Sequence, residues 1–429
     1  MKLKRLGALF LSVILILNNI SFAIKENEEE IIEDNSITMT LDEAINYALT
    51  HNASVVDINK TAKEQKEAYD DAVSTHRIWK EKIRHGGYSF ENQLEYMDCW
   101  GYSLELAKLS YDSYLLNKET VENTIMYNVE KLAYSICELE NTIELLEKTV
   151  KKQENDVKVG EVKKELNMIT DIELEATKST LNSTKIQLES LRPTLITLKT
   201  NLKSLMGFDT SKELEIILPQ REINVLSVEN LDEVITNSLE TNSSVVAAKI
   251  SYKQKEINNI IATQTSFMLK DEKKDAKEAF IDAELRFNNS VNTIKDGLYS
   301  LYNSVKSSES SVVLAKDEYN QLQIKYNQMK VMNELGMITP NDFNAFEVAV
   351  LNAKNTYEAK LNENILLNRR WEIALKIGDA MSEAAAQQQQ QQQQVAQQQQ
   401  QAAQVQQLQQ QILMLQEALQ QFQGLIPQN

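Results

Sequence analysis

Apolar residues recur at helical spacing along most of the chain, and they form two sets with the same layout. Each set begins with a short amphipathic helix and continues with three much longer ones. Few Gly or Pro residues interrupt them, since the whole chain holds only 10 Gly and 4 Pro. The expected helices span about 41–52, 54–84, 102–166 and 170–206 in the first set, then about 231–242, 244–268, 271–333 and, after the break at "LGMITPND", a last helix up to 377.

The lengths of these helices predict how they pack. The segment 102–166 would form a helix of about 65 residues, nearly 100 Å long, which cannot fold back into a globule. The two flanking helices of the first set together have about the same length, and the second set repeats this match. We therefore expect an all-α fold of long antiparallel coiled-coil hairpins, in which one continuous helix packs against two shorter helices stacked end to end.

Two internal repeats support this layout. "LDEAINYALTHNASVV" at 41–56 returns as "LDEVITNSLETNSSVV" at 231–246, and "LNMITDIELEA" at 166–176 aligns without a gap on "LGMITPNDFNA" at 335–345. Thr40 and Asn230 stand where each opening helix needs an N-cap, and Glu43 and Glu233 stand at the capping-box position. The chain thus contains two tandem structural repeats, 38–207 and 230–378.

The segments outside the repeats have different compositions. Residues 1–23 contain a basic start, a short apolar run and small residues at Ser21 and Ala23, which is typical of a secretory signal peptide. Residues 24–37 are an acidic, flexible lead, and residues 379–429 are a Gln-rich, low-complexity tail. In the inter-repeat linker, 208–229, we expect at most a small β patch at Leu214, Ile216 and Ile217.

Charge and residue types exclude several functions. The formal net charge of −17 argues against a nucleic-acid partner, which requires a basic face. The three His residues have no metal-ligand spacing, and no nucleophile with its base, phosphate loop or catalytic carboxylate pair is recognisable. We therefore predict no enzyme activity, no cofactor and no metal. Cys99 and Cys137 could pair after export, and the sequence leaves this open.

With these motifs the sequence resembles the TolC family of outer-membrane efflux proteins. The family's "LxEAIxxALxxN" opening is complete at 41–52 and has Val234 and Ser238 in place of the alanines at 231–242. Its "GxxTxxD" bend is present at Gly336, Thr339 and Asp342. The resemblance implies a homotrimer whose helical hairpins enclose a tunnel through the periplasm. It also implies two partners, a membrane-fusion adaptor that grips the bends and an inner-membrane pump.

The chain departs from the family where strands would enter the outer membrane. The two gaps between helices, about 16 residues at "GGYSFENQLEYMDCWG" and fewer than about 10 near 265–270, are too short for such strand pairs. We expect the helical tunnel to be kept and the membrane strands to be missing or vestigial. An exported location in the cell envelope follows, with membrane contact left open. The alternative function is an exported coiled-coil scaffold or spacer that conducts nothing.

The bends carry the candidate site residues. The resemblance implies that Asp342, and by the internal repeat Glu173 and Asp171, are acidic groups at the tunnel mouth; the alternative is that these carboxylates only cap helices. The candidate adaptor-docking residues are Gly336, Met337, Ile338 and Thr339 in one bend and Met168, Ile169 and Thr170 in the other. A self-satisfied hairpin turn is the alternative for these. Gly160 is interpreted as a sign of extra residues in the first bend, which would place the two tips at different heights.

Overall fold

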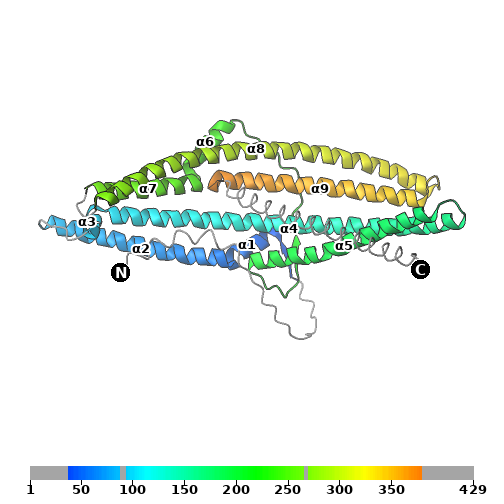
Figure 1. Cartoon of the computed structure of the whole chain (residues 1–429), viewed down its shortest axis with the longest axis horizontal. Helices are drawn as coiled ribbons and strands as arrows, with labels where there is room; N and C mark the ends of the chain where they lie inside the picture. Colours follow the sequence, from blue (N-terminus) through cyan, green and yellow to red (C-terminus); the bar gives the residue numbers. More distant parts are fainter. Residues whose placement is uncertain (1–36, 87–92, 265–268, 379–429) are drawn as a thin grey trace, which may run out of the picture.

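A computed structural model of the chain describes residues 37–86, 93–264 and 269–378 (Figure 1). The predicted signal peptide, nearly all of the acidic lead and the Gln-rich tail lie outside the described residues. The first repeat contains β1 (Ile37–Thr40), α1 (Leu41–His51), α2 (Ala53–Arg84), α3 (Gln93–Trp100), α4 (Tyr102–Glu165) and α5 (Asp171–Met206). After β2 (Leu214–Ile217), the second repeat contains α6 (Leu231–Thr241), α7 (Ser243–Gln264), α8 (Lys270–Glu334) and α9 (Pro340–Ile377).

The long helices form a single layer of four antiparallel rows (Figure 1). The first row is α2 followed end to end by α5, the second is α4, the third is α7 followed by α9, and the fourth is α8. The continuous helices α4 and α8 have 64 and 65 residues, and each packs along a stacked pair of shorter helices. This arrangement confirms the predicted all-α fold of long antiparallel hairpins. We call α2/α5 and α8 the outer rows, and α4 and α7/α9 the inner rows.

The repeated opening motif makes the joints at which the stacked helices meet. Asn52 adopts extended backbone between α1 and α2, and its side-chain oxygen accepts the amide of Ser54 at 2.8 Å. Its side-chain amide donates to the carbonyl of Leu205, 2.6 Å away, near the end of α5. One asparagine therefore caps the start of one helix and donates to a carbonyl at the end of another. The carbonyls of the last helical turn have no partner within their own helix and need such a donor.

Asn242 makes the same joint in the second repeat. It caps α7 through the amide of Ser244 at 3.1 Å and donates to the carbonyl of Ala374, 2.9 Å away, near the end of α9. Asn242 is fully buried and Asn52 nearly so. The asparagine at the end of each opening motif is therefore explained by the joint and not by the short helix that precedes it.

Gly207 completes the first joint. It ends α5 with φ +69°, and a Cβ at this position would lie 2.5 Å from the carbonyl oxygen of His51. Only glycine fits at this position, because other residues rarely adopt a positive φ and their Cβ would clash with the end of α1. Glycine at position 207 therefore allows the end of α5 to pack directly against the α1–α2 junction.

The linker contributes a small sheet that the sequence predicted only in part. The predicted strand forms as β2, and it pairs in parallel with β1, with Ile37 opposite Leu214. We did not predict β1, because it is only four residues long, ends at the capping Thr40 and has no strand-like neighbour in the sequence. The expected capping box at Thr40 forms with Glu43, whereas Glu233 accepts the side-chain amide of Asn230 in the second repeat.

Two further details differ from the expectation or extend it. The short helix α3 lies in the gap where no helix was predicted, and residues 87–92 and 265–268 of the two gaps lie outside the described residues. Cys99 lies in α3 and Cys137 in α4, and both thiols are free. Among the described helices, none is both long and apolar enough to span a membrane.

The joint geometry predicts opposite effects for two glycine substitutions. Gly207→Ala should lower the free energy of unfolding by about 1–3 kcal/mol, because it combines an unfavourable φ with a clash. Gly297→Ala is the matched control: it lies within α8 and a Cβ there meets nothing within 4 Å. It should raise stability by about 0.5–1 kcal/mol. Chemical denaturation followed by circular dichroism measures both, and a Gly207→Ala protein as stable as the parent would contradict the joint.

Candidate docking site at the hairpin bends

Both hairpins turn with the same backbone geometry at the bend. The long helix ends at Glu165 or Glu334, and after five intervening residues the next helix begins at Asp171 or Pro340. Gly336 has φ +69°, and Asn167, which stands in its place in the first bend, has φ +54°. Asparagine is the residue that most readily replaces glycine in this conformation. The missing glycine of the first bend therefore does not change the turn.

The turn residues satisfy the helix ends. The amide of Met168 donates to the carbonyl of Lys163, and the amide of Met337 donates to that of Met332, both at 2.8 Å. Each helix thus ends in the hydrogen-bond pattern of a Schellman motif, with the methionine just after the left-handed residue. The backbone of both bends is therefore self-satisfied.

The side chains of the two methionines take no part in these backbone hydrogen bonds. Met168 and Met337 are each 67% exposed. Ile169 and Ile338, which follow them, are half-buried, and Thr170 and Thr339 cap the next helices. The residues that the sequence predicted for docking are thus brought together in each bend, and among their apolar side chains the methionines are exposed whereas the isoleucines are half-buried.

Further apolar side chains extend the exposed surface of both bends, and the prediction missed them. Leu166 and Leu335 are 64% and 69% exposed, and Val162 and Val331 are 55% and 53% exposed. They occupy equivalent positions in the two repeats, because each valine lies six residues and each leucine two residues before the methionine of its bend. Ile172, at the start of α5, is 81% exposed and has Asn341 as its counterpart. The sequence offered one signal for these residues, because apolar side chains at helical spacing continue into the last turn of the helix before each bend.

The acidic candidates cap helices within this protomer. Glu173 accepts the amide of Thr170 at 2.7 Å and its hydroxyl at 3.0 Å, and these bonds lower the pKa of Glu173. Asp342 accepts the hydroxyl of Thr339 at 2.7 Å. Asp171 forms an ion pair with Lys164 across the first bend, and this partner raises the pKa of Lys164. Both Asp342 and Glu173 remain exposed, so capping does not remove their charge from the surface.

The two bends lie at different levels along the rod. In Figure 1 the α4–α5 hairpin reaches beyond the α8–α9 hairpin, and Asn341 at the start of α9 donates to Asp156, well before the end of α4, at 2.6 Å. The expected difference in height is therefore present, but its expected cause is wrong. The bends are equally long, and Gly160 lies inside α4, buried against Leu174. The structure does not bring the acidic groups of the two bends together within one protomer.

Comparison with solved structures identifies the fold. The outer membrane protein VceC from Vibrio cholerae matches with a TM-score of 0.57 and 12% identity, over 79% of this chain and 96% of that chain. The CmeC outer membrane channel of Campylobacter jejuni matches with 0.56 and 11%, over 84% and 95%. The open state of the MtrE outer membrane channel of Neisseria gonorrhoeae matches with 0.57 and 12%, over 79% and 89%.

The chain has the TolC-like fold of outer-membrane efflux channels. No family model matches the sequence, and the comparison with curated proteins gives no match. The TolC-like fold is thus shown by the three-dimensional arrangement at a sequence identity of only 11–12%. Two of these structural neighbours, CmeC and MtrE, are outer membrane channels. In this fold the two bends described above lie at one end of the helical rod (Figure 1).

The capping box of the first bend predicts a pH response. Because the folded pKa of Glu173 is lowered, the stabilisation of the first turn of α5 is present above the ordinary carboxyl pKa and is lost as the pH falls through the lowered value. Thr170→Ala should raise the pKa of Glu173 towards its ordinary value without reaching it, since the backbone amide still donates. A carboxyl-detected NMR titration measures this, and an unchanged pKa in the variant would contradict the role of the hydroxyl.

Proposed function

We propose that this protein is a homotrimeric helical conduit of an efflux or secretion system in the cell envelope, and that it docks an adaptor protein at its hairpin bends. The observation that carries this proposal is the open, single-layered protomer with a TolC-like fold. A layer of helices with two free edges leaves one side of each outer row without a neighbour. Copies placed edge to edge can cover both edges only by closing into a ring.

The distribution of exposed apolar side chains supports closure through the edges. On the outer rows, α8 exposes six large apolar side chains, α2 four and α5 three, among them Leu314, Ile78 and Ile196. Of the inner rows, α7 and α9 expose none, and α4 exposes three, two of which, Val159 and Val162, lie close to the first bend. Monomeric proteins rarely leave so many large apolar side chains exposed along a helix. The composition of the outer rows is therefore that of a protein–protein interface.

The same distribution favours a hollow assembly over a solid coiled-coil scaffold. A solid bundle needs apolar side chains on the inward face of every row, including the inner ones. The exposed side chains of the inner row α7/α9 are polar or small, as the lining of a water-filled lumen requires. The scaffold alternative would be favoured instead if the assembled particle had no central opening.

The edges predict the assembly state. Mature protein should run as an elongated trimer, and Leu314→Asp, which places a charge on the exposed surface of the outer-row helix α8, should shift it towards monomers while helicity is retained. Ala349→Asp is the matched control, because Ala349 is exposed on the inner-row helix α9. Light scattering coupled to gel filtration gives the mass, and electron microscopy shows the opening. A monomeric parent protein, or a trimer without a lumen, would refute the conduit.

The bends predict the docking variants. Changing Met337 and Ile338 together to Asp should abolish capture of the membrane-fusion adaptor of the same cell, because both residues belong to the apolar surface of the bend. Circular dichroism should be unchanged, since the turn itself is held by backbone bonds. The same pair of changes at Met168 and Ile169 tests the first bend, and Ala349→Asp again serves as the control. Unaltered capture by both double variants would remove the docking assignment and leave the fold intact.

A further inference from the structure

The end of the rod opposite the bends carries exposed apolar side chains on more than one row. At this end α2 stops, α3 packs on α2 and α4, and α7 ends where α8 begins (Figure 1). Leu94 and Trp100 of α3 are each 63% exposed, and Leu269, just before α8, is 73% exposed. We call these three residues the end patch. The docking and the ring closure proposed above use the bends and the outer rows, and they leave the end patch uncovered.

The short helix α3 is held in place, so the end patch has a defined position. Cys99 is buried, and Nδ1 of His76 donates to the carbonyl of Asp98 at 2.9 Å. The hydroxyl of Tyr96 donates to the side-chain oxygen of Gln264, the last residue of α7, at 3.4 Å. These contacts fix one side of α3 on the neighbouring helices, and they leave the leucine and the tryptophan of α3 exposed.

Local structure does not account for the end patch. Leu269 stands at the N-cap of α8, where polar side chains are preferred because they accept the free amides of the first turn. The amide of Leu269 donates to the carboxylate of Glu272 at 2.8 Å, and an aliphatic side chain adds nothing to this cap. Single exposed leucines are common, but a group that includes a tryptophan at one end of an elongated protein indicates a contact.

The end of α2 at this end of the rod is basic, unlike the chain as a whole. Residues 77–86 contain four basic residues and one acidic residue, all of them exposed: Arg77, Lys80, Lys82, Arg84 and Glu81. Helix α3 adds two acidic residues, and the first nine residues of α8 are balanced, so these segments keep a small positive excess. The chain has a formal net charge of −17. This end of the rod therefore combines apolar side chains with local positive charge.

We propose that the end patch contacts the surface of a lipid bilayer that contains anionic headgroups. Trp100 and the two leucines enter the interfacial region, where aromatic and apolar side chains are favourable, and the basic residues of α2 meet the headgroup phosphates. The inference does not depend on whether the assembly conducts.

Two other occupants fit the end patch less well. A polysaccharide surface can stack on Trp100, but it leaves the side chains of Leu94 and Leu269 uncovered. A lateral protein neighbour would cover one edge of the layer, whereas the patch belongs to α3 and to the start of α8, which lie in different rows. A bilayer surface that meets the rod end-on can cover all three side chains.

Vesicle flotation of the mature chain tests this contact. The protein should float with vesicles of phosphatidylethanolamine and phosphatidylglycerol and more weakly with vesicles of phosphatidylcholine alone, and added salt should weaken the binding to the anionic vesicles. Leu94→Ser combined with Trp100→Ser should weaken binding to both kinds of vesicle by about tenfold or more, because the apolar contact is lost. Lys80→Gln combined with Arg84→Gln should remove only the preference for the anionic vesicles.

Exposed apolar residues away from this end supply the matched control. Leu115 in α4 and Val225 in the linker are 42% and 60% exposed. A variant with Leu115→Ser and Val225→Ser should float like the parent protein. Circular dichroism should show the same helicity for every variant, since all of the replaced side chains are exposed. Equal flotation by this control and by the Leu94 and Trp100 variant would overturn the proposal.

Two further outcomes would also overturn it. Sedimentation with insoluble peptidoglycan, without flotation on vesicles and abolished by the changes at Leu94 and Trp100, would assign the end patch to a polysaccharide. A particle mass that doubles with protein concentration only when Leu94 and Trp100 are intact, again without flotation, would make a second copy of the chain the occupant. Flotation is measured whatever the mass of the particle, so its failure is distinguishable from a failure of the proposed conduit.

Discussion

The end-to-end joint between stacked helices is the constraint on which the rest of the structure depends. A continuous helix of 64 or 65 residues can be covered along its length only if two shorter helices meet without a gap. Helix ends carry unsatisfied amides and carbonyls, and burying them without partners is costly. Asn52 and Asn242 solve this problem with one side chain each, which caps the following helix and binds the end of the other.

The joints allow the protomer to remain a single layer. Each long helix has neighbours on one or two sides, and both faces of the layer are open. Such a layer has no central core comparable to that of a globular domain. Its buried apolar residues instead form clusters around α1 and α6, where the short helices and the linker add a local cover.

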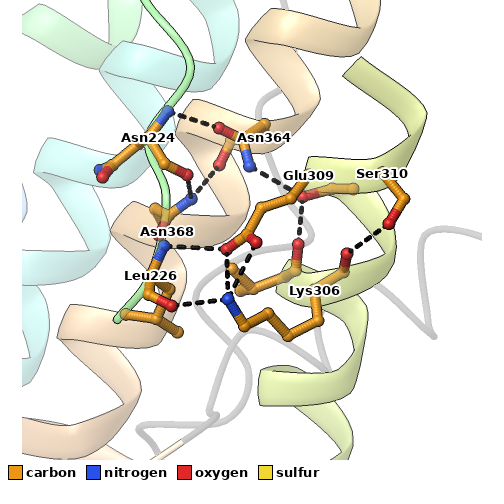
Figure 2. Close-up of polar contacts among 9 residues, drawn as sticks. Asn224, Leu226, Lys306, Glu309, Ser310, Asn364 and Asn368 are labelled. Carbon is orange, nitrogen blue, oxygen red and sulfur yellow. Dashed lines mark hydrogen bonds and ion pairs between the residues drawn. The ribbon is translucent and has the colours of Figure 1, made fainter. Parts of the chain in front are cut away.

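The two repeats have the same arrangement of helices but differ in the groups that they expose. The bends have the same turn and the same exposed apolar positions, yet the first one reaches further along the rod and carries the ion pair between Lys164 and Asp171. The linker, which belongs to neither repeat, is bound by α9 at Asn224 and by α8 at Leu226 (Figure 2). Duplication therefore explains the shared scaffold, and the two bends and the linker differ in the groups that they expose and in their contacts.

The sequence by itself determined the long helices and their matching lengths, the two opening helices, the repeats and the turn residues of the bends, because helical periodicity, capping residues and turn residues are local properties. It did not predict the short helix α3. It did not reveal β1, whose four residues form a strand only through pairing with β2. Each residue of β1 pairs with one 177 positions later in the sequence, such as Ile37 with Leu214. It also did not reveal the roles of Asn364 and Asn368, whose side chains bind the backbone of Asn224 in the linker. Polar residues within a helical pattern are ordinarily solvent-exposed, and only the tertiary structure buries these two by laying the linker across them.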